Sequence, residues 1–153
     1  MGLYIGQLAI SSAAFEHLGV IPDRYTGVGD GVAPPLTWSG APDGTRSLAV
    51  ICHDADAPLP HGWTHWIVVG IPPDADRIPE GGRAFVEATN DFGDLGYGPP
   101  MPPEGHGCHH YYFWVYALGA DVDADPTLTR AQFLERWGDQ VIEQARTVGT
   151  VDR

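Results

Sequence analysis

The chain has 153 residues, enough for one domain with a substantial hydrophobic core, and we predict a single domain over residues 1–153. Its 20 acidic residues outnumber its 8 basic residues, all of them arginine, and the net charge is −12. An acidic surface repels phosphate polymers, so nucleic acid is excluded as an expected partner. No run approaches the roughly 18 apolar residues that cross a membrane, and the N-terminus lacks the basic region of a signal peptide. We therefore expect a cytoplasmic protein without a transmembrane segment.

The first half of the chain is predicted to form short strands separated by Gly/Pro-rich turns, a pattern typical of a mainly β fold. Residues 3–10 alternate apolar and polar positions, as a half-buried strand does. Residues 36–38 predict a short strand. Residues 47–53 and 64–71 are continuous apolar runs, which predict central strands that are buried on both faces.

The second half joins a loop to a third central strand. Residues 83–90 are a candidate short strand. Residues 96–107 are so rich in Gly and Pro that they exclude a helix and disfavour a central strand. Residues 109–118 are aromatic and β-branched without a break and predict a buried strand. A Gly/Pro loop brings backbone N–H groups close to a ligand, and a rigid strand fixes side chains beside it, so this junction indicates a small-ligand pocket.

One helix is predicted near the C-terminus. Thr129 and Gln132 have the spacing of a capping box, with Thr at the N-cap and Gln at the third helical position. Apolar residues then recur at helical spacing, which predicts a helix over residues 129–146 that ends before Gly149. We expect this helix to pack on the sheet through its apolar face, which includes Phe133, Trp137 and Val141.

Polar clusters adjoin all three predicted central strands. Asp54 and Asp56 follow the first strand, Trp63 and His65 begin the second, and residues 106–112 begin the third. These three strand ends can meet at one edge of a sheet, so we predict a pocket of Asp, His and Tyr side chains with Gly/Pro backbone. We predict no catalytic residue and no metal site, because the chain lacks a GxSxG nucleophile motif and an HExxH metal motif.

The same clusters resemble the two signatures of the phosphatidylethanolamine-binding protein family, in its bacterial and archaeal Raf-kinase-inhibitor-like branch. Residues 54–58 read Asp-Ala-Asp-Ala-Pro, where the first signature has an Asp-Pro-Asp-Ala-Pro core. His65, within Trp-Thr-His-Trp, corresponds to the ligand histidine on the next strand of the family. Residues 102–111 correspond to the second signature, a Gly-Pro-Pro loop followed by His-Arg-Tyr. Residues 34–38 resemble the start of the first core strand in the family.

This resemblance implies a large antiparallel sheet packed on a smaller sheet, with a C-terminal α-helix. It also implies a pocket that binds the phosphate of a phospholipid headgroup or a similar small anion, without a cofactor. The implied walls are Asp54, His65, Pro103, His109 and Tyr111. Asp56 and Trp63 would support them. From the residues themselves, we expect the backbone N–H groups of Gly105 to Gly107 to add an anion nest, and His65 or His109 to donate to the anion.

The chain departs from the family pattern at several positions. Ala55 replaces a proline of the first signature, and Cys108 stands where this branch usually has proline. His110 replaces the arginine of the second signature and removes a permanent positive charge near the pocket. The C-terminus lacks the additional helical tail of eukaryotic members. We therefore expect positive charge at the pocket to come from histidine.

Three functions are consistent with these patterns. The first, which we predict, is a non-catalytic regulatory module that binds a small anion or a phosphoethanolamine-like headgroup. The second is an inhibitor of a kinase or a protease, which the family name suggests for some relatives. The third is a phosphoester hydrolase, either metal-free or with zinc held by Asp54, His65, His106 and His109. A homodimer is compatible with each of them.

Overall fold

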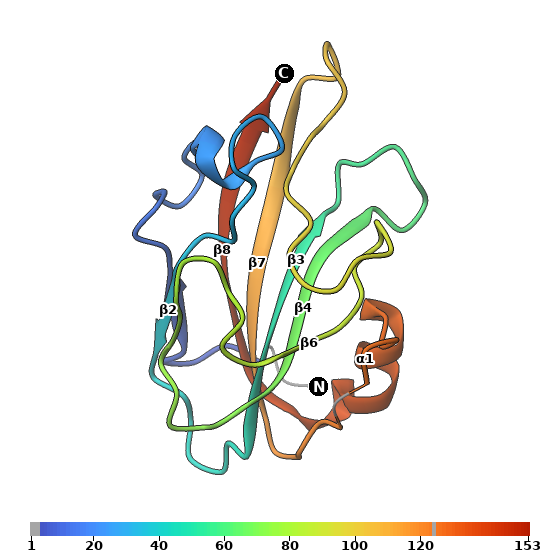
Figure 1. Cartoon of the computed structure of the whole chain (residues 1–153). Coiled ribbons are helices and arrows are strands. Elements are labelled where there is room, and N and C mark those ends of the chain that lie inside the picture. Colours follow the sequence, from blue (N-terminus) through green and yellow to red (C-terminus); the bar gives the residue numbers. More distant parts are fainter. Residues whose placement is uncertain (1–3, 124) are drawn as a thin grey trace.

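The computed structural model describes residues 4–123 and 125–153, which form two antiparallel β-sheets and one α-helix (Figure 1). The small sheet has the strand order β1-β2-β5 and the large sheet has the order β6-β4-β3-β7-β8. The strands are β1 (Ala9–Ser11), β2 (Leu36–Ser39), β3 (Ser47–Asp54), β4 (Trp63–Ile71), β5 (Arg77–Ile78), β6 (Val86–Glu87), β7 (Cys108–Leu118) and β8 (Val141–Asp152). The helix is α1 (Arg130–Trp137), and two 3₁₀ turns, η1 (Asp23–Tyr25) and η2 (Gly138–Gln140), complete the described elements. The predicted fold class is confirmed.

The three central strands are confirmed, and both faces of the large sheet are covered. Along β3, Val50 and Cys52 pack toward the small sheet, in one hydrophobic cluster with Trp38. Ile51 points to the opposite face, where it belongs to a second cluster with Phe133 of α1. Figure 1 shows β2 on one side of the large sheet and α1 on the other. Because both faces are covered, these strands are continuously apolar instead of alternating.

The C-terminal helix is much shorter than predicted. The capping box is present: Gln132 N–H donates to Thr129 Oγ1, and Thr129 N–H donates to Gln132 Oε1, both at 3.1 Å. However, α1 ends at Trp137, and residues 141–152 form β8, with Val141 paired to Leu118. The prediction that the helix continues to residue 146 is therefore wrong.

Strand pairing explains this difference. β7 is eleven residues long, and β8 satisfies its backbone groups from the pair Cys108–Asp152 to the pair Leu118–Val141. The Val and Thr residues of β8 suit a strand, and helical spacing alone does not reveal a partner that lies far away in the sequence. Gly149, expected to follow the helix, instead lies in β8, where a Cβ atom would come within 2.5 Å of Ile21.

Two other strand predictions were too long. Of residues 3–10, residue 3 lies outside the described part of the chain, and a strand begins only at Ala9. Residues 83–90 contain only the two-residue strand β6, and they follow a turn in which Gly81, Gly82 and Arg83 all have positive φ. Such a turn breaks the extended backbone that a longer strand needs. Strand β5 was not predicted.

Candidate ligand-binding pocket

The three polar clusters meet at one end of the large sheet, as predicted. Asp54, the last residue of β3, pairs in register with Trp63 at the start of β4 and with Tyr111 near the start of β7. β3 is antiparallel to both neighbours, so the place where it ends is the place where they begin. Figure 1 shows that the β3–β4 loop and the loop before β7 lie together at this end.

A cavity of about 170 Å³ opens there, and all five predicted wall residues line it. Trp63 also lines it, whereas Asp56, Gly105 and Gly107 do not. The cavity has four polar lining residues and eight apolar ones. The polar ones are Asp54, His65, His109 and Tyr111, and the apolar ones are Ala57, Pro58, Leu59, Trp63, Phe92, Met101, Pro102 and Pro103.

The apolar rim was missed by the sequence analysis. Leu59 comes from the β3–β4 loop, whereas Phe92 and Met101 come from separate parts of the β6–β7 connection, and each is close to half exposed, at 49%, 48% and 47%. Only their grouping around one cavity marks these residues, because single exposed apolar side chains are ordinary on protein surfaces, and the sequence does not show that grouping.

A chain of three side chains crosses the polar floor. Asp54 Oδ2 lies 2.6 Å from His109 Nδ1, and His109 Nε2 lies 2.6 Å from Nδ1 of His106. The Asp54 and His109 side chains are only 4% and 3% exposed, while His106 is exposed. Both ring nitrogens of His109 are therefore engaged within the protein. Donation from His109 to an anion stays a prediction and would require His106 to release Nε2; His106 forms the exposed end of the chain.

His65 is held differently, and its Nε2 has no hydrogen-bond partner among the described residues. Its Nδ1–H donates to the Gly98 carbonyl at 2.6 Å. Its ring contacts Tyr111 and Phe92 edge-on, with centroids 5.1 and 5.3 Å apart. Burial lowers the pKa of His65, so the ring is neutral at pH 7 and its Nε2 accepts hydrogen bonds. Protonation at lower pH converts the same atom into a donor.

Two further donors belong to the cavity. Tyr111 is only 1% exposed, and burial together with the nearby Asp54 carboxylate raises its pKa well above the ordinary range. Tyr111 therefore keeps its phenolic proton at physiological pH. The buried Nε1 of Trp63 has no hydrogen-bond partner among the described residues. A buried donor without a partner is uncommon and is often a place where a ligand or water supplies the acceptor.

Asp56 contacts the site indirectly. Its Oδ2 accepts from the backbone N–H of His110 and lies 2.8 Å from His110 Nδ1. Burial opposes ionisation of Asp56, but the His110 hydrogen bonds outweigh it and lower the pKa of this carboxyl. This pair joins the β3–β4 loop to β7 one residue from His109.

Two of the three amides of the expected anion nest at Gly105–Gly107 are engaged within the protein. Gly105 N–H donates to the Arg153 carbonyl at 2.9 Å, and His106 N–H donates to the Pro103 carbonyl at 3.1 Å. These amides hold the loop and do not face the cavity. Arg153, which the sequence analysis overlooked, also donates from its guanidinium to the Pro102 carbonyl at 3.0 Å. An arginine thus positions the Pro-Pro wall of the pocket.

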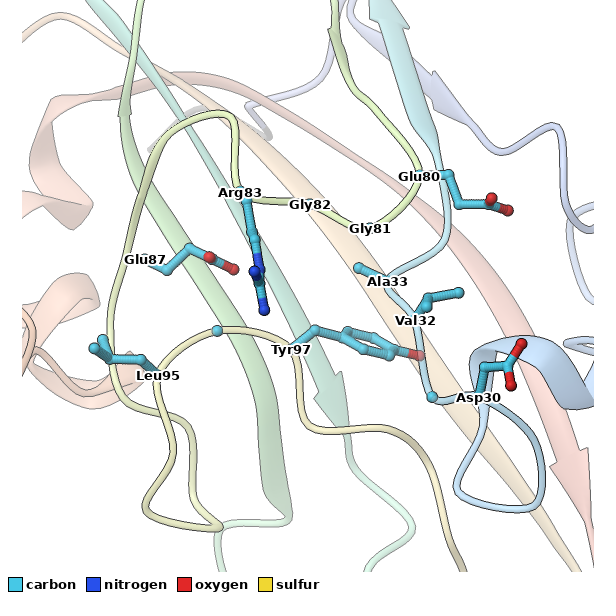
Figure 2. Close-up of a pocket in the computed structure, with 12 residues that line it drawn as sticks. Asp30, Val32, Ala33, Glu80, Gly81, Gly82, Arg83, Glu87, Leu95 and Tyr97 are labelled. Carbon is cyan, nitrogen blue, oxygen red and sulfur yellow. The ribbon is translucent and has the colours of Figure 1, made fainter.

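A larger cavity, of about 550 Å³, lies elsewhere, where the loop before Ala33 meets the Gly81–Gly82 turn (Figure 2). Figure 2 shows Arg83 extending between Glu87 and Tyr97. Several of its polar groups are already bonded: Glu87 accepts from Trp66 Nε1 at 2.7 Å, and the Tyr97 hydroxyl donates to the Tyr25 carbonyl at 2.7 Å. It contains none of the three polar clusters, so the smaller cavity is the candidate site.

The described residues contain no group of three or more His, Cys, Asp or Glu side chains arranged to hold a metal ion. In the same part of the chain, no helix is long and apolar enough to cross a membrane.

Comparison with known proteins gives consistent relatives. A family model described as phosphatidylethanolamine-binding protein matches residues 11–152. A UPF0098 protein of Methanothermobacter thermautotrophicus is 40% identical over 151 residues, which cover 94% of this chain and 98% of the relative.

Two crystal structures are closely similar to the present one. CT736 of Chlamydia trachomatis has a TM-score of 0.89 and 34% identity, over 95% of this chain and 97% of CT736. YbcL of Escherichia coli, described as a member of the mammalian PEBP family, has a TM-score of 0.90 and 30% identity, over 97% of this chain and 99% of YbcL.

Proposed function

This chain belongs to the phosphatidylethanolamine-binding protein family, and from this premise we propose that its pocket binds a small anion, such as the phosphate of a phosphoethanolamine-like headgroup, without catalysis. The observation that carries the proposal is the combination of a polar floor and an apolar rim in one cavity. A phosphorylated amphiphile has the same two parts. We infer a regulatory binding module, because the Tyr111 hydroxyl and the Trp63 indole N–H beside an apolar rim suit recognition of a ligand.

The size of the pocket limits the ligand. A volume of about 170 Å³ corresponds to roughly five or six water molecules, at about 30 Å³ each. It accommodates a headgroup and leaves acyl or other apolar parts to the rim of Leu59, Phe92 and Met101.

The charge of the pocket favours weak, pH-dependent binding. The protein carries a net charge of −12, and the buried Asp54 carboxylate is part of the floor. At neutral pH, the anion would be bound by the Tyr111 hydroxyl and the Trp63 indole N–H. As pH falls, protonated His65 adds a charged donor, and charge-assisted hydrogen bonds are about twice as strong as neutral ones.

A hydrolase is less well supported. None of the described residues that line the cavity is Ser, Thr or Cys, and the raised pKa of Tyr111 makes its oxygen a poor nucleophile. A kinase- or protease-inhibiting role remains compatible with the half-exposed rim, which offers an apolar surface to a protein partner.

The test is a titration of the ¹⁵N-labelled protein with phosphoethanolamine, inorganic phosphate and sulfate at about pH 5.5 and pH 8, read at the His65 and Tyr111 amides. Sulfate keeps its charge over this range, so its pH dependence reports the protein. We expect Tyr111→Phe to weaken binding about tenfold, or ~1.4 kcal/mol, because one donor to a charged acceptor is lost. Tyr112→Phe, on the next residue of β7, is the matched control and should bind as the wild type does.

His65→Gln should remove most of the gain in sulfate affinity at low pH. If Tyr111→Phe and His65→Gln both bind like the wild type while remaining folded by thermal melting, this pocket is not the anion site.

A further inference from the structure

A second polar cavity lies behind the first, on the α1 side of the large sheet. Its volume is about 200 Å³, and its lining includes His53 of β3, Thr64 of β4 and the first residues of α1. His53 and Thr64 each precede a residue of the pocket, Asp54 and His65. Successive side chains of a strand point to opposite faces, so the same two strand ends supply two separate cavities.

The cavity is lined by an arginine whose Nε has no partner among the described residues. The Nε of Arg130 is buried and makes no hydrogen bond to the described residues. Arg136, on the same helix, lies 3.9 Å from Asp125. A buried donor without a partner is unfavourable, more so in a charged group, and an acceptor in the cavity would relieve this cost.

His53 adds a second donor to the cavity. It is 7% exposed, and its Nδ1 lies 3.0 Å from the Thr64 hydroxyl, which is its one hydrogen bond within the described residues. When the Thr64 hydroxyl donates to Nδ1, the neutral ring carries its proton on Nε2. Burial, and secondly the charge of Arg130, lower the pKa of His53 to about 4, so the ring is neutral at physiological pH.

The first turn of α1 completes the set of donors. The capping box of Thr129 and Gln132 satisfies the N–H groups of those two residues, and Phe133 N–H donates to the Thr129 carbonyl. The N–H groups of Arg130 and Ala131, which also line the cavity, are first-turn donors without an intrahelical acceptor. The positive end of the helix dipole favours a negative group at this position.

One carboxylate opposes such a ligand. Asp91 lines the same cavity, and its Oδ2 accepts from Thr64 N–H at 2.7 Å. This bond holds the carboxylate against the wall and engages one of its oxygens. The negative charge of Asp91 should limit the affinity of the site for an anion. Removing this charge should therefore raise the affinity, whereas removing the charge of Arg130 should lower it.

We propose that this cavity is a second anion site, in which Arg130, the His53 ring and the first-turn amides of α1 bind a small oxyanion of the carboxylate or phosphate type. It is independent of the family pocket, because the two share no lining residue. The buried Nε of the partly exposed Arg130, which has no partner among the described residues, and the buried His53 ring point to a ligand, and the helix end alone would not.

The experiment titrates the ¹⁵N-labelled protein with sulfate, inorganic phosphate or acetate, with chloride added to hold the ionic strength constant. The Arg130 and Ala131 amides should shift in a saturable way, and acetate compared with phosphate distinguishes a carboxylate ligand from a phosphate ligand. Arg130→Gln should weaken binding at least about tenfold, because it removes the charged donor of the site. Asp91→Asn, which keeps an oxygen to accept from Thr64, should strengthen it severalfold.

Arg136→Gln is the matched control on the same helix and should leave the titration unchanged, as should Tyr111→Phe in the other pocket. Thermal melting verifies that each variant is folded. The absence of a saturable shift at Arg130 and Ala131 in the wild type overturns the proposal, as does equal affinity in Arg130→Gln. If Arg130→Gln does not fold, unchanged or weaker binding by Asp91→Asn overturns it.

Discussion

At the end of β3 and the start of β4, the polar side chains on the two faces of the large sheet differ in their hydrogen-bond partners. On the face toward the small sheet, Asp54 and His109 form a buried pair at 2.6 Å, and His106 extends it to the surface. On the α1 face, His53 bonds only to Thr64, and the buried Nε of Arg130 has no partner among the described residues. One polar cluster is pre-organised by its own carboxylate, while the other leaves donors free. Neighbouring residues of one strand can therefore belong to a fully bonded cluster on one face and to a cluster with unpaired donors on the other.

The faces should also differ in how much their aromatic residues stabilise the protein, and this is the largest effect that we expect. Phe133 of α1 is fully buried, whereas Phe92 at the pocket rim is 48% exposed. Phe133→Ala should lower the free energy of unfolding by about 3–5 kcal/mol. Phe92→Ala should lower it by about 1 kcal/mol or less, as the matched control. Urea denaturation measures both, and equal losses would show that α1 is not the packed face.

Removing the carboxylate of the pre-organised cluster should have the next largest effect. Asp54→Ala leaves the buried His109 ring without its Nδ1 partner, so we expect a loss of about 2–3 kcal/mol in the free energy of unfolding. On the other face, Thr64→Val removes the hydroxyl bonded to His53 and should cost about 1 kcal/mol. A larger loss for Thr64→Val than for Asp54→Ala would reverse the comparison between the two faces.

The smallest effect that we expect is a loss of stability at mildly acidic pH. Burial lowers the pKa of His53 from 6.5 to about 4 and also lowers the pKa of His65. Between about pH 6.5 and pH 4, the unfolded chain therefore binds more protons than the native protein. The stability is fully present above this window and is lost as the pH falls through it.

For His53, with allowance for solvent screening, we expect the melting temperature to fall by about 2–4 °C between pH 7 and pH 5. His53→Gln should reduce that fall, as measured by differential scanning calorimetry at both pH values. A variant with the same pH dependence as the wild type would show that His53 does not titrate in this window.

At the C-terminus, a local sequence pattern determines where α1 begins, whereas pairing with a distant strand determines where the helix gives way to β8. The Thr129–Gln132 capping box is local, and the start of α1 was predicted correctly. Residues 141–146 keep helical spacing, yet they form β8, because pairing with β7 satisfies a long row of backbone groups. That competition involves residues about thirty positions apart, so no local pattern records it.

The sequence by itself determined the mainly β class and the three central strands, because continuous apolar runs are local features. Its resemblance to the two family signatures named five of the twelve residues that line the pocket. Only the tertiary structure decided which polar atoms are left to bind a ligand and which side chains surround them. It engaged both nitrogens of His109, turned the Gly105 amide toward Arg153, and brought Phe92 and Met101 to the rim. It also placed His53 and Arg130 in one cavity behind the pocket. Hydrogen bonds join specific atoms across the fold, and their partners are set by how the strands and loops pack.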